Sequence, residues 1–173
     1  MKNAYNGDFM KEYLVFSDAH GNTDAVERVI SSHESIKDVL FLGDGVSMLP
    51  YLKSRFPLVS FVAVKGNCDG FCGCSMGDYP AQRVLEVEGH RILLTHGHLH
   101  GVKSSLIPLV SSAQAAGCDI ALFGHTHIYT ERYQAINGAA VCLFNPGSIG
   151  MGECSYGVLY INGSIVLFSQ GRA

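Results

Sequence analysis

The amino-acid sequence predicts a mixed α/β fold built as one domain over residues 1–173. Short apolar runs alternate with amphipathic segments in the first third of the chain, which is the pattern of β-α-β units. Hairpin patterns follow in the remainder, so the predicted sheets mix parallel and antiparallel strands. Hydrophobic residues make up 47% of the sequence, which is enough for a large core and excludes intrinsic disorder. No linker, internal repeat or low-complexity tract divides the chain.

The first third of the chain contains three apolar runs typical of strands that are buried on both faces. They cover residues 13–16, 39–42 and 59–64. Between these runs we expect a helix over 23–31, with Asn22 or Thr23 as its N-cap, and a short helix over 47–55. This β-α-β-α-β order predicts parallel strands joined by right-handed crossovers.

The rest of the chain predicts one further helix, one further buried strand and three hairpins. The helix covers 102–116, is the longest predicted one, and ends at Gly117 as a C-cap glycine. The buried strand covers 120–123. The hairpins join 83–87 to 91–95 around Glu88-Gly89, 129–136 to 139–144 around Asn137-Gly138, and 158–161 to 164–168 around Asn162-Gly163.

Charge and composition argue against several classes of protein. Lys and Arg number 12 against 15 Asp and Glu, giving a net charge of −3 without a basic cluster, which argues against a nucleic-acid partner held by charge. No apolar run reaches about 18 residues, so no membrane span is predicted. Residues 1–8 lack the apolar core of a signal peptide, and we therefore expect a cytoplasmic protein with reduced cysteines. Cys118 and Cys142 lie in apolar segments and are expected in the core.

Eight histidines in a chain with only 16% charged residues point to a specific use for them. Each of five predicted strands runs directly into a short polar segment. These segments are 17–22, 43–45, 66–69, 95–98 and 124–127. Because ligands of open α/β sheets bind beyond the carboxyl ends of the strands, we expect the five segments to converge on one site.

The side chains of these segments form a set of candidate metal ligands. They are Asp18, His20, Asp44, Asn67, His96, His125 and His127. Asp18 and His20 are two residues apart, as are His125 and His127, so an extended backbone would point both members of each pair the same way. Nitrogen and oxygen donors of this kind suit manganese, iron, nickel or zinc, of which we expect manganese.

The number of candidate ligands predicts two divalent metal ions. One ion takes about four to six ligands, whereas the set has seven, and Asp44 stands alone on its turn as a bridging carboxylate could. Two ions about 3.5–4 Å apart are the arrangement used for in-line displacement at phosphorus.

In order along the chain, the segments resemble the five motifs of the calcineurin-like metallophosphoesterases: Asp-x-His, Gly-Asp, Gly-Asn, a His before Gly, and Gly-His-x-His. The resemblance spans Asp18 to His127. Residues Asn145-Pro146-Gly147-Ser148 are similar to the small bacterial and archaeal phosphodiesterase branch. The resemblance implies a four-layer α/β/β/α sandwich with mixed sheets, forming a single metallophosphoesterase domain over 1–173.

The same resemblance implies a distribution of ligands and a reaction. The first ion would be held by Asp18, His20, Asp44 and His127, and the second by Asp44, Asn67, His96 and His125. The implied activity is that of a phosphodiesterase, in which a hydroxide bridging the metals attacks phosphorus without a protein nucleophile. The implied partner is a small-molecule phosphate ester, and small relatives often form dimers or tetramers.

One position departs from the family pattern. Many members follow Gly-Asn with a histidine that protonates the leaving oxygen, whereas this chain has Cys68 followed by Asp69. A thiol is a poor hydrogen-bond donor, and its presence would affect alkyl monoesters most, so we favour diesters. His98 is a candidate general acid in its place, or equally a solvated loop histidine. Cys68, Asp69 and His98 are thus the candidate catalytic residues beyond the ligands.

Other interpretations remain open at the level of sequence. A phosphomonoesterase or nucleotide phosphatase of the same family fits the same motifs, as does a non-catalytic scaffold such as a retromer trafficking subunit, although scaffolds tend to lose ligands. Cys68, Cys72 and Cys74 could form a separate zinc site, but a loop that affects substrate access is favoured. His90 and His100 are expected at the surface.

Overall fold

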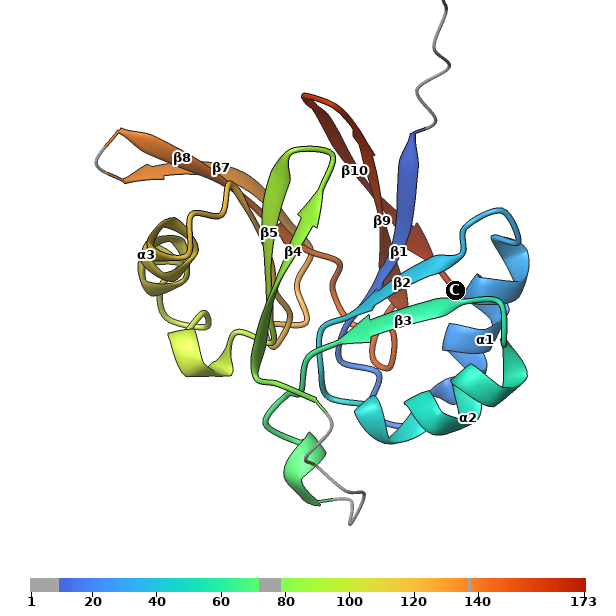
Figure 1. Ribbon diagram of the computed structural model, residues 1–173. Helices are drawn as coiled ribbons and strands as arrows, with labels where there is room; N and C mark the ends of the chain where they lie inside the picture. Colours follow the sequence, from blue (N-terminus) through green and yellow to red (C-terminus); the bar gives the residue numbers. More distant parts are fainter. Residues whose placement is uncertain (1–9, 72–78, 137) are drawn as a thin grey trace, which may run out of the picture.

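The computed structural model describes residues 10–71, 79–136 and 138–173. Two five-stranded sheets lie face to face, with helices on the outer side of each (Figure 1). In strand order, sheet A consists of β10 (Ile165–Arg172), β9 (Ser155–Asn162), β1 (Lys11–Phe16), β2 (Asp38–Phe41) and β3 (Ser60–Ala63). Sheet B consists of β4 (Gln82–Val87), β5 (His90–Thr95), β6 (Ile120–Leu122), β8 (Ala139–Asn145) and β7 (Thr130–Ile136).

Helices cover the outer face of each sheet. Helices α1 (Thr23–Ser32) and α2 (Leu49–Arg55) pack on sheet A, and α3 (Ile107–Ala115) packs on sheet B. In the part of the chain that the structure describes, short 3-10 turns follow strands β2, β3 and β5; they are η1 (Val46–Met48), η2 (Asp69–Phe71) and η4 (His98–His100). The predicted four-layer α/β/β/α sandwich is therefore confirmed.

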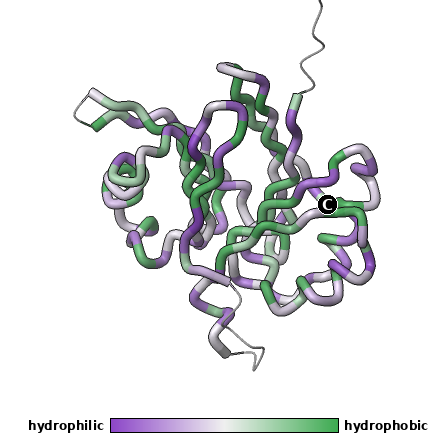
Figure 2. The backbone as a smooth tube through the Cα atoms, viewed as in Figure 1, coloured by the Kyte–Doolittle hydropathy of each residue, from purple (hydrophilic) through white to green (hydrophobic). Residues whose placement is uncertain are grey.

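Strand β1 shows why the central strands are apolar throughout. Leu14 and Phe16 pack into the core between sheet A and its helices, whereas Tyr13 and Val15 pack into the core between the two sheets. Successive side chains of a strand point to opposite faces, so a strand covered on both sides needs an apolar residue at every position. Figure 2 shows this hydrophobic colouring along the inner strands.

The parallel pairing predicted for the three strands in the first third of the chain is confirmed, and sheet B contains further parallel pairs that were not predicted. In sheet A, β1 pairs with β2 and β2 pairs with β3, both in parallel. In sheet B, β5 pairs with β6 and β6 with β8, again in parallel. Their carboxyl ends lie together at the lower edge of the view in Figure 1, where the loops of both sheets meet.

The prediction of a helix over 102–116 is wrong at its start. Helix α3 begins at Ile107, and α1, with 10 residues, is the longest helix in the described chain. Pro108 explains the difference, because a proline inside a helix lacks the N–H donor and its ring clashes with the carbonyl four residues earlier. The predicted end is confirmed, since Gly117 takes φ 67° just after the helix.

The turn between β9 and β10 lies one residue later than predicted. Asn162 pairs with Ile165 in the ladder, so the two central residues are Gly163 and Ser164. Gly163 has φ 54°, which a glycine adopts readily at the first position of such a turn. Asn137, predicted in the turn between β7 and β8, lies outside the described residues.

The structure also bears on the cysteines and on membrane spans. Cys118 and Cys142 are buried, as predicted for core residues. Cys68, Cys118, Cys142 and Cys154 are free thiols. Within the described ranges, no helix is both long and apolar enough to cross a membrane.

Two histidines expected at the surface are not fully exposed. His100 is 8% exposed, and its Nε2 lies 3.1 Å from the Nε2 of Gln82. The His90 side chain is 16% exposed, and its ring nitrogens lie 2.5 Å from Asp119 Oδ2 and 2.8 Å from the carbonyl oxygen of Gly163. The expectation failed because these contacts come from segments distant in sequence.

Burial of His100 predicts a pH-dependent stability. Burial lowers the pKa of this imidazole, so at acidic pH the folded state binds fewer protons than the unfolded state. The free energy of unfolding should therefore fall as the pH drops below about 6.5, the ordinary histidine value. In the metal-free protein, His100→Phe should flatten this dependence by at most about 1.4 kcal/mol per pH unit, measured by denaturant unfolding at several pH values. Equal slopes for variant and wild type would contradict the assignment.

Candidate metal centre

The seven predicted ligands all follow strands that end at the same edge of the sandwich. Asp18 and His20 follow β1, Asp44 follows β2, Asn67 follows β3, His96 follows β5, and His125 and His127 follow β6. Backbone hydrogen bonds join the loops within each sheet: Asp18 N–H donates to the Gly43 carbonyl at 3.0 Å, and Gly124 N–H donates to the His96 carbonyl at 3.1 Å. The loops are thus held at fixed positions relative to one another.

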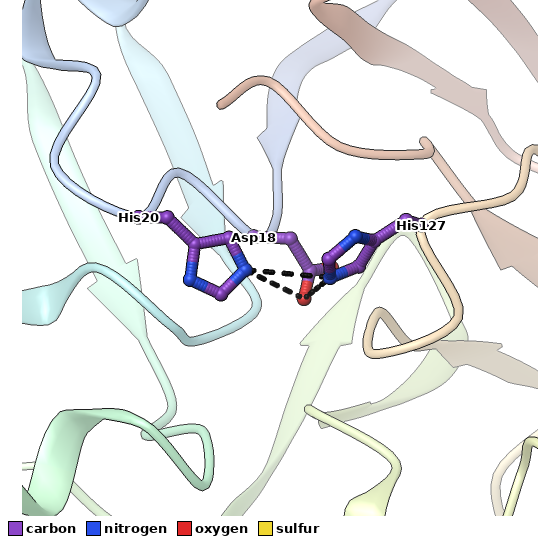
Figure 3. A group of neighbouring side chains, drawn as sticks. All are labelled: Asp18, His20 and His127. Atoms are coloured by element: carbon purple, nitrogen blue, oxygen red, sulfur yellow. Dashed lines mark hydrogen bonds and ion pairs between the residues drawn. The ribbon is translucent and has the colours of Figure 1, made fainter. Parts of the chain in front are cut away.

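A first group of donors consists of Asp18, His20 and His127, shown in Figure 3. Asp18 Oδ1 lies 3.1 Å from His127 Nε2 and 3.9 Å from His20 Nε2. The two imidazole Nε2 atoms are 3.3 Å apart. One ligand atom from each residue thus lies within 4.8 Å of the others, close enough to hold a single ion.

A second group of donors consists of Asp44, His96 and His125. His96 Nε2 lies 3.2 Å from Asp44 Oδ2 and 3.7 Å from Asp18 Oδ1, so it also borders the first group. A third group joins Asp44 to His20 and the thiol of Cys68. Asp44 therefore approaches ligands on both sides, which is the position that a shared carboxylate requires.

The two most deeply buried members of the centre each carry an atom without a hydrogen-bond partner. Asp18 and His96 are fully buried, and Asp18 Oδ1 and His96 Nε2 are both unpartnered. The other atoms of these side chains are occupied: Asp18 Oδ2 accepts from Ser17 Oγ at 2.6 Å and from His125 N–H at 2.9 Å. His96 Nδ1 lies 2.7 Å from the Leu42 carbonyl oxygen.

These unpartnered atoms fit divalent cations. A buried oxygen or nitrogen without a partner is costly, so native structures seldom keep one without a use. A histidine that donates Nδ1–H to a backbone carbonyl presents the lone pair of Nε2, the usual arrangement of a metal-binding histidine. The carboxylate and imidazole donors also match the ligand preferences of manganese, iron, nickel and zinc.

Backbone strain is concentrated at the same residues. Seven non-glycine residues in the described chain have positive φ, and five of them are predicted ligands. These five are Asp18 (54°), His20 (46°), Asp44 (55°), His125 (67°) and His127 (60°). The left-handed conformation costs about 1–2 kcal/mol for an ordinary residue and clusters at functional sites.

The same backbone angles correct the reason given for the paired ligands. The segments from Asp18 to His20 and from His125 to His127 are not extended, because both ends of each have positive φ. Asp18 and His20 nevertheless reach the same group. His125 and His127 instead belong to different groups, so their side chains do not point to one ion.

Electrostatic contacts inside the centre favour an ionised Asp44. Burial opposes its ionisation, but the imidazole of His96 close to its Oδ2 and the backbone N–H of Cys68 outweigh burial and hold the pKa of Asp44 well below its usual range. Burial likewise disfavours the charged form of His96, but the nearby carboxylates of Asp44 and Asp18 raise its pKa. The negative Asp44 carboxylate thus faces a positively charged His96. A cation bound at Asp44 would take the place of that positive charge.

Asn67 and Cys68 lie at the exposed side of the centre. The Asn67 amide nitrogen donates to the Cys68 thiol at 3.2 Å, and the Cys68 N–H donates to Asp44 Oδ1 at 2.7 Å. Burial, followed by the hydrogen bond to Asp44, raises the pKa of the Cys68 thiol to about 11. Cys72 and Cys74, which could have formed a zinc site with Cys68, lie outside the described residues.

Asp69 is buried, and both of its carboxylate oxygens are occupied by backbone donors. Oδ2 accepts from the N–H groups of Asp44 at 2.9 Å and Gly66 at 2.7 Å. Oδ1 accepts from Gly45 at 2.7 Å and Val46 at 3.0 Å. We therefore propose a positioning role for Asp69 in place of the catalytic role expected from its neighbourhood, because it fixes the turn that presents Asp44.

His98 borders the centre from the first turn after His96. Its ring centroid lies 5.5 Å from that of His96 and 6.1 Å from that of His125. Its Nδ1 is buried without a hydrogen-bond partner. Burial, followed by the nearby charge of His96, lowers its pKa. The ring is thus placed beside the predicted ligands and not on a solvated loop.

Two supporting residues were not assigned a role from the sequence. Ser148 Oγ donates to the Asp18 carbonyl at 2.8 Å. The Asn145 amide nitrogen donates to the Gly124 carbonyl at 2.9 Å, which fixes the loop carrying His125. Their signals in the sequence were the similarity of residues 145–148 to the phosphodiesterase branch and a polar segment directly after an apolar strand, and neither shows what they contact.

Close packing at the centre also requires glycine at two positions. A Cβ atom on Gly66 would lie 2.1 Å from Asp44 Oδ1, and one on Gly124 would lie 1.8 Å from Ser17 Oγ. The backbone therefore approaches the ligands more closely than any other residue type permits.

Comparison with known proteins gives consistent matches. The calcineurin-like phosphoesterase superfamily domain matches residues 11–163. Probable metallophosphoesterase YsnB from Bacillus subtilis (strain 168) is 35% identical over 138 residues, covering 79% of this chain and 73% of that protein. Phosphodiesterase YfcE from Escherichia coli (strain K12) is 29% identical over 173 residues, covering 87% and 88%.

Solved structures share the fold. A protein from Streptococcus pneumoniae TIGR4, described as a predicted phosphoesterase, matches with a TM-score of 0.74 and 29% identity over 95% of this chain and 90% of that chain. Vacuolar Protein Sorting 29 from Cryptosporidium parvum matches with a TM-score of 0.71 and 20% identity over 96% and 100%. At 20% identity the second likeness shows the fold alone.

The contacts of Asp69 predict the effect of replacing it. Asp69→Asn places an amide NH₂ against two backbone N–H donors, so the free energy of unfolding should fall by about 2–4 kcal/mol. Affinity for Mn²⁺ should fall about 10–100-fold, because the turn carrying Asp44 loses its support. Denaturant unfolding and calorimetric titration measure the two effects. Glu86→Gln, the same change at an exposed ion pair with Arg91, is the control and should alter neither. Wild-type Mn²⁺ affinity in Asp69→Asn would refute the positioning role.

Proposed function

This chain belongs to the calcineurin-like phosphoesterase superfamily, and we propose that it is a divalent-metal-dependent phosphodiesterase with a dinuclear centre. One observation carries the proposal. Two fully buried, unpartnered atoms, Asp18 Oδ1 and His96 Nε2, lie 3.7 Å apart, one in each of two groups of metal-type donors. Two adjacent ions are the arrangement used for in-line displacement at phosphorus.

The proposed ligands divide between two ions that share one carboxylate. The first ion is assigned to Asp18, His20, Asp44 and His127, and the second to Asp44, Asn67, His96 and His125. The contacts of Asp44 with His96 on one side and its grouping with His20 on the other support the sharing. We propose manganese as the native metal, with iron, nickel and zinc as alternatives, because the donors are imidazole nitrogens and hard oxygens.

The protein's own residues prepare this centre for phosphoryl chemistry. When bound, two divalent ions lower the pKa of a water molecule and neutralise charge on the phosphoryl oxygens. Ser17 fixes the carboxylate of Asp18, and the Leu42 carbonyl fixes the orientation of His96. The fixed loops keep both donors in place before substrate binds, so little reorganisation is needed during the reaction. No serine or cysteine nucleophile is required.

A phosphodiester is the proposed substrate class. Cys68 occupies the position at which many family members have a histidine, and a thiol is a weak proton donor. His98, whose ring borders His96 and His125 and whose Nδ1 is unpartnered, is proposed as the general acid for the leaving group. The similarity to the relative named phosphodiesterase YfcE supports the same choice.

The alternatives are a phosphomonoesterase and a non-catalytic scaffold. The likeness in fold to Vacuolar Protein Sorting 29 keeps the scaffold as the second candidate. A scaffold, however, gives no reason for five strained candidate ligands around two unpartnered buried atoms.

The proposed activity predicts a metal-dependent preference for diesters. With Mn²⁺, the protein should hydrolyse bis(4-nitrophenyl) phosphate faster than 4-nitrophenyl phosphate, and a chelator should abolish both reactions. Asp44→Asn should lower kcat by at least about 100-fold, because it removes the shared carboxylate. Release of 4-nitrophenolate measures the rates, and elemental analysis should give two metal ions per wild-type chain.

Three results would count against this assignment in different ways. Faster monoester hydrolysis would favour the phosphomonoesterase. Inactivity with manganese, iron, nickel and zinc would favour the scaffold. Full activity of Asp44→Asn, with circular dichroism confirming the fold, would remove the shared carboxylate from the mechanism.

A separate prediction concerns His98. His98→Gln should lower turnover about 100-fold for a diester with a poor leaving group, such as methyl phenyl phosphate. It should have little effect on bis(4-nitrophenyl) phosphate, since 4-nitrophenolate leaves without a proton. The pH profile of kcat for both substrates is the measurement. An unchanged rate and profile on the poorer leaving group would exclude the role.

A further inference from the structure

A pocket of about 310 Å³ lies directly beside the candidate metal centre. Thr126 and Ile128 line it, and they alternate in sequence with His125 and His127. One loop therefore supplies both candidate ligands and a wall of the pocket.

The floor of the pocket is apolar. Val102 is 5% exposed and Phe123 is fully buried, and Leu106 joins them beside the start of α3. Ile128, 67% exposed, forms part of the rim. Pockets that bind small ligands have volumes of about 300–1,000 Å³, so this one suits a single ring-sized organic group.

The hydroxyl groups of the pocket are occupied by the protein itself. Thr126 Oγ1 accepts hydrogen bonds from the Asn145 amide at 3.0 Å and from Ile128 N–H at 3.3 Å. Thr130 Oγ1 donates to the Ile128 carbonyl at 3.3 Å. Polar recognition of a ligand therefore falls to the two charged side chains of the pocket, Lys103 and Arg132.

Both charged side chains of the pocket are cationic and available. Lys103 and Arg132 are exposed, and within the described ranges neither forms an ion pair, whereas Arg55, Arg91 and Arg172 do. Among the residues that the structure describes, none of those lining the pocket is acidic. An anionic group entering it would meet two cations and no opposing charge.

We propose that this pocket selects phosphodiesters in which one ester group is apolar and carries its own negative charge. The inference rests on the proposed phosphodiesterase activity and specifies its substrate class. The apolar part packs on Val102 and Phe123, and the anionic part lies between Lys103 and Arg132. A carboxylate and a phosphate share the required chemistry.

Three matched substrates test the pocket. Each is a 4-nitrophenyl phosphodiester whose second group is 4-ethylphenyl, 4-carboxymethylphenyl or 4-phosphonomethylphenyl, so all release the same reporter. In the Mn²⁺-loaded wild type, kcat/KM should be about tenfold higher for the anionic substrates than for the ethyl compound, and the preference should fall with added salt. The more favoured of the two anionic groups identifies which kind of charge the pocket accepts.

Charge variants assign the preference to the pocket. Arg132→Gln and Lys103→Gln should each lower the preference about three- to fivefold while leaving the ethyl substrate unchanged. Arg132→Glu should reverse it. Arg83→Gln is the matched control, because Arg83 is an exposed arginine of β4, at the opposite edge of sheet B from β7. A wild type without the preference, or variants that retain it, would overturn the proposal.

A binding measurement separates this inference from the proposed activity. Methylphosphinates that carry the same three aryl groups through a P–CH2 bond have no ester bond to hydrolyse, so their Kd values can be measured by calorimetry without turnover. Tighter binding of the anionic compounds, lost in Arg132→Gln, would support the pocket even if no diester were hydrolysed, in which case only the phosphodiesterase would fall. Hydrolysis of all three diesters with equal Kd values would overturn the pocket and leave the activity standing.

Discussion

The carboxylate of Asp18 is fully buried where the loops of the two sheets meet, and the protein satisfies only one of its oxygens. Oδ2 is held by Ser17 and by the backbone of His125, which links the loop after β1 to the loop after β6. The Asp18 carbonyl in turn accepts from Ser148 and Gly150, which links the segment after β8 to the same residue. Loops from both sheets are thus fixed around one side chain, and Oδ1 is left for a cation.

The energetic cost of this arrangement is confined to the loops of the metal centre, and the surrounding fold holds those loops in place. Five candidate ligands adopt the left-handed conformation, and two candidate ligands, Asp18 and His96, each have a buried polar atom without a hydrogen-bond partner. Such features persist only where the surrounding structure determines them. Here the fully buried strands of both sheets hold the loop ends in place, and the Asp69 carboxylate fixes the turn at Asp44 through three backbone hydrogen bonds and holds Gly66 through a fourth. The packing of the two sheets therefore stabilises loops whose backbone is strained at the candidate ligands.

The sequence predicted the strands well because a strand that is buried on both faces has apolar residues at successive positions, and such a run is visible in the sequence. It placed β1, β2 and β3 in parallel and identified the C-terminal end of α3 at Gly117. It misplaced two boundaries, and each of them depends on a single residue. Pro108 moved the start of α3, and the pairing of Asn162 in the ladder moved the turn between β9 and β10. Both errors are local and leave the layers unchanged.

The polar segments themselves were visible in the sequence, since residue type and position after a strand suffice to predict where candidate ligands gather. The family resemblance implied how they divide between two ions, and the tertiary structure groups their donor atoms in space. His125 and His127 joined different groups because positive φ at both residues turns their side chains away from the pattern of an extended strand. Four backbone donors from distant and neighbouring turns occupy the oxygens of Asp69, and the positioning role that we propose for this residue rests on them. Sequence thus determined which chemical groups reach this edge of the fold, whereas the three-dimensional packing of loops decided which atoms remain free to act.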